Sequence, residues 1–194
     1  MTKLYVTEFP GLAATVQSDS VDIAPEPATQ TQVINTAATT GQIAVLGAIT
    51  GGSLYTNGAY TNVPLTGGTG SGATANITVS GGAVTAVTLV SRGSGYTAAD
   101  SLSAAAANIG GTGSGFAIPV SSITQQITLA PSTRFVELAA DGICSFRVGL
   151  DPVATTSDAR IPANNQPLRR GIQAPVGLLG AGQTQWKLSA ITNT

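Results

Sequence analysis

The chain has 194 residues, and only 9% of them are charged, where soluble domains have about 25%. It has no histidine and a formal net charge of −1, which excludes histidine-based catalysis and argues against nucleic acid as a partner. The hydrophobic fraction of 42% is enough for a core, so we expect a folded protein with a polar, uncharged surface or one buried against partners. The single cysteine, Cys144, excludes an internal disulfide and is expected to be a buried strand residue.

The N-terminal segment begins with a β-rich run, Leu4–Thr7, which ends at a Pro-Gly turn. Residues 18–32 carry three acids and the run Pro-Glu-Pro, which disfavours a helix. We therefore predict an extended arm over residues 1–32, which is either flexible or lies along a neighbouring subunit. The opening residues lack the apolar core of a secretion signal, and no stretch reaches the roughly 18 apolar residues of a membrane span. We expect synthesis in a cytoplasm and no membrane partner.

A repeated glycine block marks the middle of the chain. Residues 67–72 read GGTGSG, and the same six residues return at 110–115. Each block is preceded by a matching Tyr-Thr, at Tyr55 and at Tyr96, and is followed by a run suited to a strand. We therefore predict a duplicated β module over residues 51–123, rich in glycine, serine, threonine and alanine. Structural assemblies use such modules to supply surface area and spacing, and they are poorly suited to catalysis.

The clearest local signal lies inside this module. Residues 75–80 alternate polar and apolar, Gly81 and Gly82 form a two-residue turn, and residues 83–90 alternate again. This pattern predicts a β-hairpin. Residues 116–123 predict a further strand, and residues 104–107 could make a helical turn.

Charges return after residue 126, where residues 134–138 and 143–148 read as two strands around the turn Asp141-Gly142. Further strand candidates are residues 33–36, 42–49, 171–175 and 185–191. The segments before residue 50 and after residue 124 hold all the charged residues except two, Arg92 and Asp100. We therefore predict an all-β fold with one β-sandwich, formed by residues 33–50 and 124–194 and interrupted by the module at 51–123.

Candidate chemistry is sparse. Asp151 and Asp158 are close in sequence, but both are better explained by hydrogen bonds within turns. The GGTGSG blocks are followed by strands rather than helices, and no lysine lies between Lys3 and Lys187, so they do not fit a phosphate-binding loop. We predict no catalytic residue, no cofactor and no metal ion.

The basic residues are candidates for subunit contacts. Arg169 and Arg170 form the one adjacent basic pair. Together with Arg160, they are either solvated surface residues or partners of an acidic patch on a neighbouring subunit. Phe146 and Trp186 are expected in the core, with interface anchoring as the alternative.

Residues 133–164 resemble small virion proteins of tailed bacteriophages. In these, an Arg-Phe-Val strand precedes a cysteine-bearing strand, a Gly-x-x-Pro-x-Ala-Thr loop and a Ser-Asp-x-x-x-Pro-Ala turn, as at positions 134–163 here. The opening residues 4–9 and the final Ile-Thr-Asn-Thr fit the same group, and Gly-Ser-Gly-Tyr-Thr at 93–97 resembles repeats of phage structural proteins, including fibres. The resemblance implies a non-enzymatic β-sandwich, with a jelly roll as one form, that decorates or cements the outer capsid surface. Its implied partners are the major capsid protein and copies of itself.

Other functions stay open on the sequence. The leading alternative is a head or tail fibre or spike that contacts the host, for which the test is an elongated trimer that forms without the shell. An enzyme and an unrelated β-rich binding module are further alternatives, and the sequence contains no aromatic platform for a host glycan. The homo-oligomer could be a dimer or a trimer.

Overall fold

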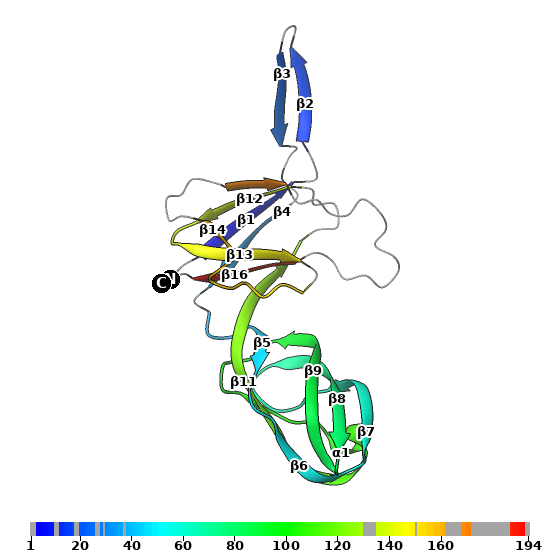
Figure 1. Ribbon diagram of the computed structural model, residues 1–194. Coiled ribbons are helices and arrows are strands. Elements are labelled where there is room, and N and C mark those ends of the chain that lie inside the picture. Colours follow the sequence, from blue (N-terminus) through cyan, green and yellow to red (C-terminus); the bar gives the residue numbers. More distant parts are fainter. Residues whose placement is uncertain are drawn as a thin grey trace. The chain divides into compact units, whose positions relative to one another are not determined.

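We describe the fold from a computed structural model. In the part of the chain that it describes, every element except one short helix is a β-strand. This confirms the predicted all-β class. The chain divides into two compact units (Figure 1): unit 1 comprises residues 1–37 and 125–194, and unit 2 comprises residues 38–124. The structure describes residues 3–9, 12–17, 20–25, 28, 30–36, 38–129, 135–149, 151–161, 168–171 and 187–192.

The first sheet of unit 1 has four antiparallel strands in the order β15-β12-β1-β4. They are β15 (Leu168–Gly171), β12 (Phe135–Ala140), β1 (Lys3–Phe9) and β4 (Gln30–Asn35). In β1 the alternate residues Leu4 and Val6 are fully buried, so one face of this strand lies against the core. The sequence interpretation assigned these residues to an extended arm over 1–32, whereas the structure pairs β1 on both sides, with β12 and with β4.

The segment between β1 and β4 forms a separate hairpin. Strands β2 (Leu12–Gln17) and β3 (Ser20–Pro25) make a two-stranded sheet of their own. Their register runs from Leu12 opposite Pro25 to Gln17 opposite Ser20. We call this segment the β2–β3 ribbon.

The second sheet of unit 1 has the order β11-β16-β13-β14. It consists of the end of β11 (Gly111–Thr128), β16 (Lys187–Thr192), β13 (Cys144–Gly149) and β14 (Ala159–Ile161). Both sheets contribute to one core, so unit 1 is a sandwich of two antiparallel sheets; its jelly-roll form stays a prediction at this point. The buried residues of this core are Leu4, Val6, Ile34, Leu129, Val136, Leu138, Ala140, Cys144, Phe146, Ile161, Leu188 and Ala190.

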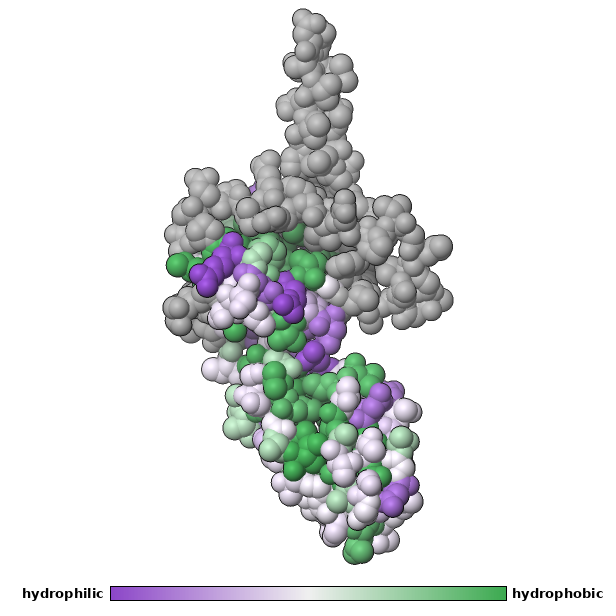
Figure 2. Space-filling view, viewed as in Figure 1, coloured by the Kyte–Doolittle hydropathy of each residue, from purple (hydrophilic) through white to green (hydrophobic). Residues whose placement is uncertain are grey.

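Unit 2 has two groups of strands. One is the sheet β7 (Gly58–Pro64), β8 (Ser71–Ser80) and β9 (Ala83–Ser94); in the other, β11 pairs with β5 (Gln42–Leu46), β6 (Thr50–Tyr55) and β10 (Ser101–Leu102). The helix α1 (Ala106–Ile109) precedes β11. The surface of unit 2 in Figure 2 is mostly pale or green, with few purple, strongly hydrophilic residues.

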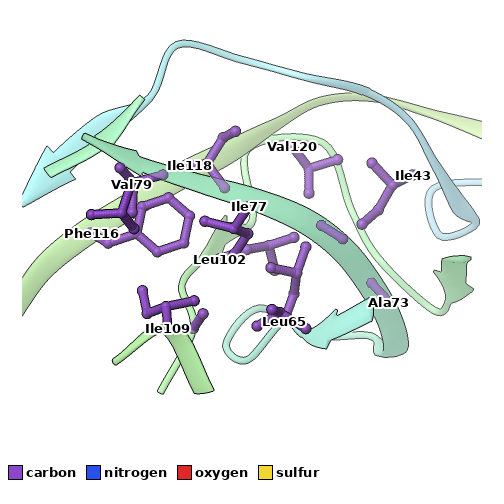
Figure 3. Packing of buried hydrophobic residues seen from close by; sticks show 14 of the residues in the cluster. Ile43, Leu65, Ala73, Ile77, Val79, Leu102, Ile109, Phe116, Ile118 and Val120 are labelled. Atoms are coloured by element: carbon purple, nitrogen blue, oxygen red, sulfur yellow. The ribbon is translucent and has the colours of Figure 1, made fainter. Parts of the chain in front are cut away.

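The hairpin predicted from the sequence is present in unit 2. Ser80 pairs with Ala83, and the turn residues Gly81 and Gly82 have φ values of 63° and 78°, which suit a two-residue turn that needs positive φ at both positions. The apolar faces of β8 and β11 pack together in the core of unit 2 (Figure 3), whose largest members include Ile77, Ile109, Phe116 and Ile118.

The chain enters and leaves unit 2 on neighbouring strands. Gln42, the first residue of β5, pairs with Thr124, the last residue of unit 2, and Ile43 pairs with Ile123. The two ends of unit 2 therefore lie beside each other.

Candidate functional site

The two copies of the repeat in unit 2 interlock. The ring of Tyr55, from the first copy, lies against Gly113, the fourth residue of the second glycine block. Reciprocally, the ring of Tyr96, from the second copy, lies against Gly70, the fourth residue of the first block, where an added Cβ would be 2.5 Å from the ring. Because both rings are buried, a side chain on either glycine would overlap an aromatic ring. Neither copy completes its own packing without the other.

A second glycine pair follows the same reciprocal scheme. Gly52 and Gly93 lie three residues before the two tyrosines, have φ values of 65° and 57°, and pack against the backbone of the opposite copy at residues 114–116 and 71–73. The copies differ two residues after these glycines, where the first copy has Leu54 and the second has Gly95. Leu54 keeps the left-handed φ of 65° that suits glycine, and it is 72% exposed.

The two charged residues of unit 2 are both used in holding its backbone. Asp100 accepts hydrogen bonds from the N–H of Thr97 at 2.9 Å and from the N–H and hydroxyl of Thr69 at 3.1 and 2.7 Å. The Thr97 N–H contributes most, followed by Thr69, and together they lower the pKa of Asp100 to about 2. Arg92 donates from Nη1 to the carbonyl oxygens of residues 43 and 44, at 2.6 and 2.9 Å. Unit 2 has one positive and one negative residue, so its formal charge is zero.

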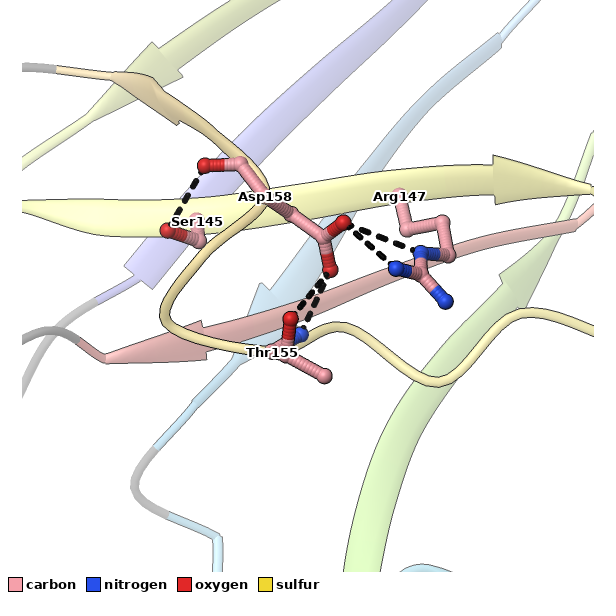
Figure 4. Close-up of polar contacts among 4 residues, drawn as sticks. All are labelled: Ser145, Arg147, Thr155 and Asp158. Atoms are coloured by element: carbon pink, nitrogen blue, oxygen red, sulfur yellow. Dashed lines mark hydrogen bonds and ion pairs between the residues drawn. The ribbon is translucent and has the colours of Figure 1, made fainter.

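In unit 1, a polar cluster fastens the loop 151–158 to β13 (Figure 4). Asp158 Oδ1 accepts from Nε and Nη2 of Arg147 at 3.0 and 2.7 Å, and its Oδ2 accepts from the N–H and hydroxyl of Thr155 at 2.7 and 3.0 Å. The Thr155 N–H is the main cause of the lowered pKa of Asp158, and Arg147 adds to it. This confirms that turn hydrogen bonds account for Asp158.

The other acid considered in the sequence, Asp151, makes a separate contact. Gln126 donates from Nε2 to the carbonyl oxygen of Pro152 at 2.5 Å and, more weakly, to Asp151 at 3.4 Å. The two carboxylates therefore fasten different parts of the same loop.

The three arginines predicted as interface residues fall on different sheets. Arg160 lies on β14 of the second sheet, opposite Ser145, is exposed, and donates from Nη2 to the carbonyl of Thr156 at 3.4 Å. Arg169 and Arg170 lie on β15, an outer strand of the first sheet, opposite residues 137 and 136; their side chains are outside the described part of the structure. The structure thus keeps Arg169 and Arg170 together and places Arg160 elsewhere.

Two other expectations are confirmed in the core of unit 1. Cys144 is fully buried on β13, and burial raises the pKa of its thiol to about 11, so it behaves as a small apolar residue. Phe146 is buried in the same core. Trp186, which was also expected in the core, lies outside the described residues.

An exposed apolar pair on the first sheet was not predicted. Tyr5 on β1 and Val33 on β4 are directly opposite each other and are 39% and 48% exposed, whereas their neighbours Leu4 and Ile34 are buried. The alternation of Leu4 and Tyr5 in the sequence indicates that one of them faces the core and the other faces away from it. It does not reveal that β4, with Val33, lies opposite Tyr5. Tyrosine is among the residue types that are enriched where protein interfaces are strongest, whereas valine is not.

Among the described residues, no group of three or more acidic or cysteine side chains has the arrangement of a metal site. No helix in the same ranges has the length and apolarity of a membrane span. Comparison of the chain with protein-family models, with curated proteins and with solved structures finds no match.

Proposed function

We propose that this chain is a non-enzymatic structural protein of a bacteriophage virion, which binds the outer surface of the capsid shell and stabilises it as a decoration or cement protein. The observation that carries the proposal is unit 2. It is an interlocked β unit with zero formal charge, and the chain enters and leaves it on neighbouring strands. Such a unit can supply surface area and spacing, which suits an outward-facing part of a shell protein.

The strand order of unit 1 supports a jelly-roll sandwich, a fold that recurs in viral capsid proteins. A jelly roll has one sheet with the order first, eighth, third, sixth and another with the order second, seventh, fourth, fifth. We number the strands of unit 1 in chain order from β4, the first, through the end of β11, the second, to β16, the seventh, and count β1 as the eighth. The sheet β4-β1-β12-β15 then has the order first, eighth, third, sixth, and the sheet β11-β16-β13-β14 has the order second, seventh, fourth, fifth. We propose that unit 1 is a jelly roll whose last strand stands at the start of the chain. A fold alone does not give a function, so this point supports the proposal but does not carry it.

The Tyr5–Val33 pair is the candidate contact with the major capsid protein. The two residues are exposed, apolar and directly opposite each other on neighbouring strands of one sheet. A protein bound in many copies to a lattice needs little affinity per contact, because neighbouring contacts raise the local concentration. A small apolar patch is therefore sufficient if copies also contact one another.

A head or tail fibre remains the second candidate. It is favoured by the interlocked repeat of unit 2, because the Gly-Ser-Gly-Tyr-Thr segment that resembles fibre repeats provides Tyr96, one of the two interlocking rings. In that case unit 2 would contact the host surface.

Cryo-electron microscopy of the virus particles that contain this chain, with mass spectrometry to count its copies, tests the proposal. Hundreds of ordered copies on the shell are expected. A few copies confined to the tail or to one vertex would overturn the cement role and favour the fibre.

A binding assay with shells that lack the protein tests the contact surface. The variant Tyr5→Ser/Val33→Ser is expected to lose most of its binding. The control Val45→Ser changes a valine of unit 2 that is similarly exposed, at 52%, and should bind like the parent. Equal binding by the two variants would exclude the Tyr5–Val33 pair as the contact.

A further inference from the structure

The sequence contains one Asn-Gly pair, Asn57-Gly58, in unit 2. Asn57 lies in the short connection between β6 and β7, Gly58 is the first residue of β7, and both are exposed. Asparagine is a thermolabile residue, because the main-chain nitrogen of the residue that follows it can attack its side-chain carbonyl carbon, Cγ. Glycine has no Cβ to obstruct this attack. The pair therefore places an electrophile beside an unhindered nucleophile in contact with solvent.

The carboxamide of Asn57 is oriented through its oxygen. The N–H of Gly82, in the β8–β9 turn, donates a hydrogen bond to Oδ1 at 2.9 Å. The same N–H would stabilise the negative charge that develops on Oδ1 when a nucleophile attacks Cγ. In the part of the chain that the structure describes, the side-chain nitrogen Nδ2 has no hydrogen-bond partner. No contact therefore has to break before this nitrogen leaves.

The structure leaves room around Gly58. A Cβ added to this glycine would have as its nearest neighbours only atoms of the Tyr60 side chain, at 3.5 Å, which is an ordinary van der Waals distance. The φ of Gly58 is not left-handed, so alanine also suits the backbone here. This position therefore allows a variant that hinders the reaction without disturbing the fold.

Asn76 on β8 provides an internal comparison. It is also exposed, and its Oδ1 also accepts a main-chain N–H, that of Asn62, at 2.9 Å. The residue that follows it is Ile77, which is 1% exposed and is paired on both sides, with Tyr60 and with Val87. The branched side chain and the two pairings restrain the main-chain nitrogen of Ile77. The environments of the two asparagines thus differ mainly in the residue that follows each of them.

We propose that Asn57 is a site of spontaneous deamidation in the folded protein. Hydroxide removes the proton of the Gly58 N–H, and this nitrogen forms a bond to Cγ of Asn57. The bond between Cγ and Nδ2 then breaks, and Nδ2 takes up a proton from water and leaves as ammonia. Water opens the resulting cyclic imide at one of its two carbonyl carbons, which gives either aspartate or isoaspartate at position 57. The net reaction consumes water, releases ammonia and creates one negative charge.

The two products would affect unit 2 differently. Aspartate leaves the main chain unchanged, and its carboxylate can accept the Gly82 N–H, as the carboxylate of Asp100 accepts two other main-chain N–H groups. Isoaspartate adds one carbon to the main chain between β6 and β7, so Gly82 would lose its partner. Either product changes the formal charge of unit 2 from zero to −1. This site does not depend on the proposed capsid role, because every reacting group belongs to the chain or to water.

Incubation of the full-length protein in mildly alkaline buffer tests the proposal, with peptide mass spectrometry to identify the converted residue and isoelectric focusing to follow the charge. We expect Asn57 to convert before Asn76, and an acidic form shifted by one negative charge to accumulate. Asn57→Gln should lose this form, because its longer side chain would have to close a larger ring. Gly58→Ala should form it more slowly than the parent. Asn76→Gln is the matched control and should form it at the parent rate.

Either of two results with the parent protein would overturn the proposal, and neither depends on how well the variants fold. One is that Asn57 stays intact in the folded protein but converts after unfolding in guanidinium chloride, since the fold would then protect the pair. The other is that Asn57 and Asn76 convert at the same rate, since the glycine and its open surroundings would then have no effect.

Discussion

Replacing Gly113 by alanine should strongly destabilise unit 2. The new Cβ would overlap the buried ring of Tyr55, which is 6% exposed. If the ring stays in place, the overpacking costs about 1–3 kcal/mol. If the ring moves out, about 2 kcal/mol of apolar burial is lost, and the N–H of Phe116, which donates to the Tyr55 hydroxyl at 3.2 Å, loses its partner at a cost of about 1–3 kcal/mol. We therefore expect Gly113→Ala to lower the free energy of unfolding by about 3 kcal/mol.

The measurement is urea unfolding followed by circular dichroism, combined with hydrogen exchange of the β8 and β11 peptides to report on unit 2 alone. Gly58→Ala is the matched control, because its Cβ would lie at an ordinary 3.5 Å from the Tyr60 ring and its φ is not left-handed; it should change stability by less than about 0.5 kcal/mol. Gly70→Ala should match Gly113→Ala, because Tyr96 occupies the equivalent place. If Gly113→Ala were as stable as Gly58→Ala, the interlocking of the two repeats would be refuted.

Three further predictions concern single side chains. The pKa of Asp100 is about 2 in the folded protein, below its usual 3.8, so its stabilising effect is present above about pH 4 and is lost as the pH falls toward 2; Asp100→Asn should remove this part of the pH dependence of the urea midpoint, and an unchanged pH profile would contradict it. Cys144 is buried and its thiol pKa is raised to about 11, so a thiol reagent at pH 8 should label it only after denaturation, and rapid labelling of the native protein would show that β13 is not in the core. Asp158→Ala removes the hydrogen bond to Thr155 within the 151–158 loop and the ion pair that fastens the loop to Arg147 on β13. It should increase protease cleavage within this loop while lowering overall stability by only about 1 kcal/mol, because Arg147 is half exposed. A loop as resistant as in the parent would show that other contacts hold it.

Local features of the fold could be predicted from the sequence, and distant pairings could not. The β8–β9 hairpin was predictable because alternation and the Gly81-Gly82 turn specify it within twenty residues. The strand β1 was also predictable as a strand, but its partners are β4 and β12, and Leu4 lies opposite Ala140. No local pattern indicates such a partner, so these residues were interpreted as an arm.

The repeat shows the same limit within unit 2. The sequence reveals that Tyr55 and Tyr96 precede equivalent glycine blocks, but not which block each ring covers. Tyr55 covers the block that starts 55 residues later rather than the nearer one, and only the pairing of β6 with β11 decides this. Leu54 illustrates the cost of divergence between copies, since a left-handed φ is kept where the second copy has glycine.

Among the candidate site residues, Asp158 was predictable because its partner Thr155 is three residues away. The separation of Arg160 from Arg169 and Arg170 was not predictable, because it depends on which sheet receives β14 and which receives β15. The Tyr5–Val33 pair likewise joins residues from two strands that are separated in the chain by the β2–β3 ribbon.

The pairing of Gln42 with Thr124 has a consequence for how this chain could change over time. A folded insert whose ends lie on neighbouring strands adds almost nothing to the loop that its host must close, and its replacement leaves the register of the host strands unaltered. The connection between β4 and the end of β11 is thus a natural grafting point, at which unit 2 could be exchanged for an unrelated domain with adjacent termini. Related chains would then share the sandwich while displaying different domains in this position.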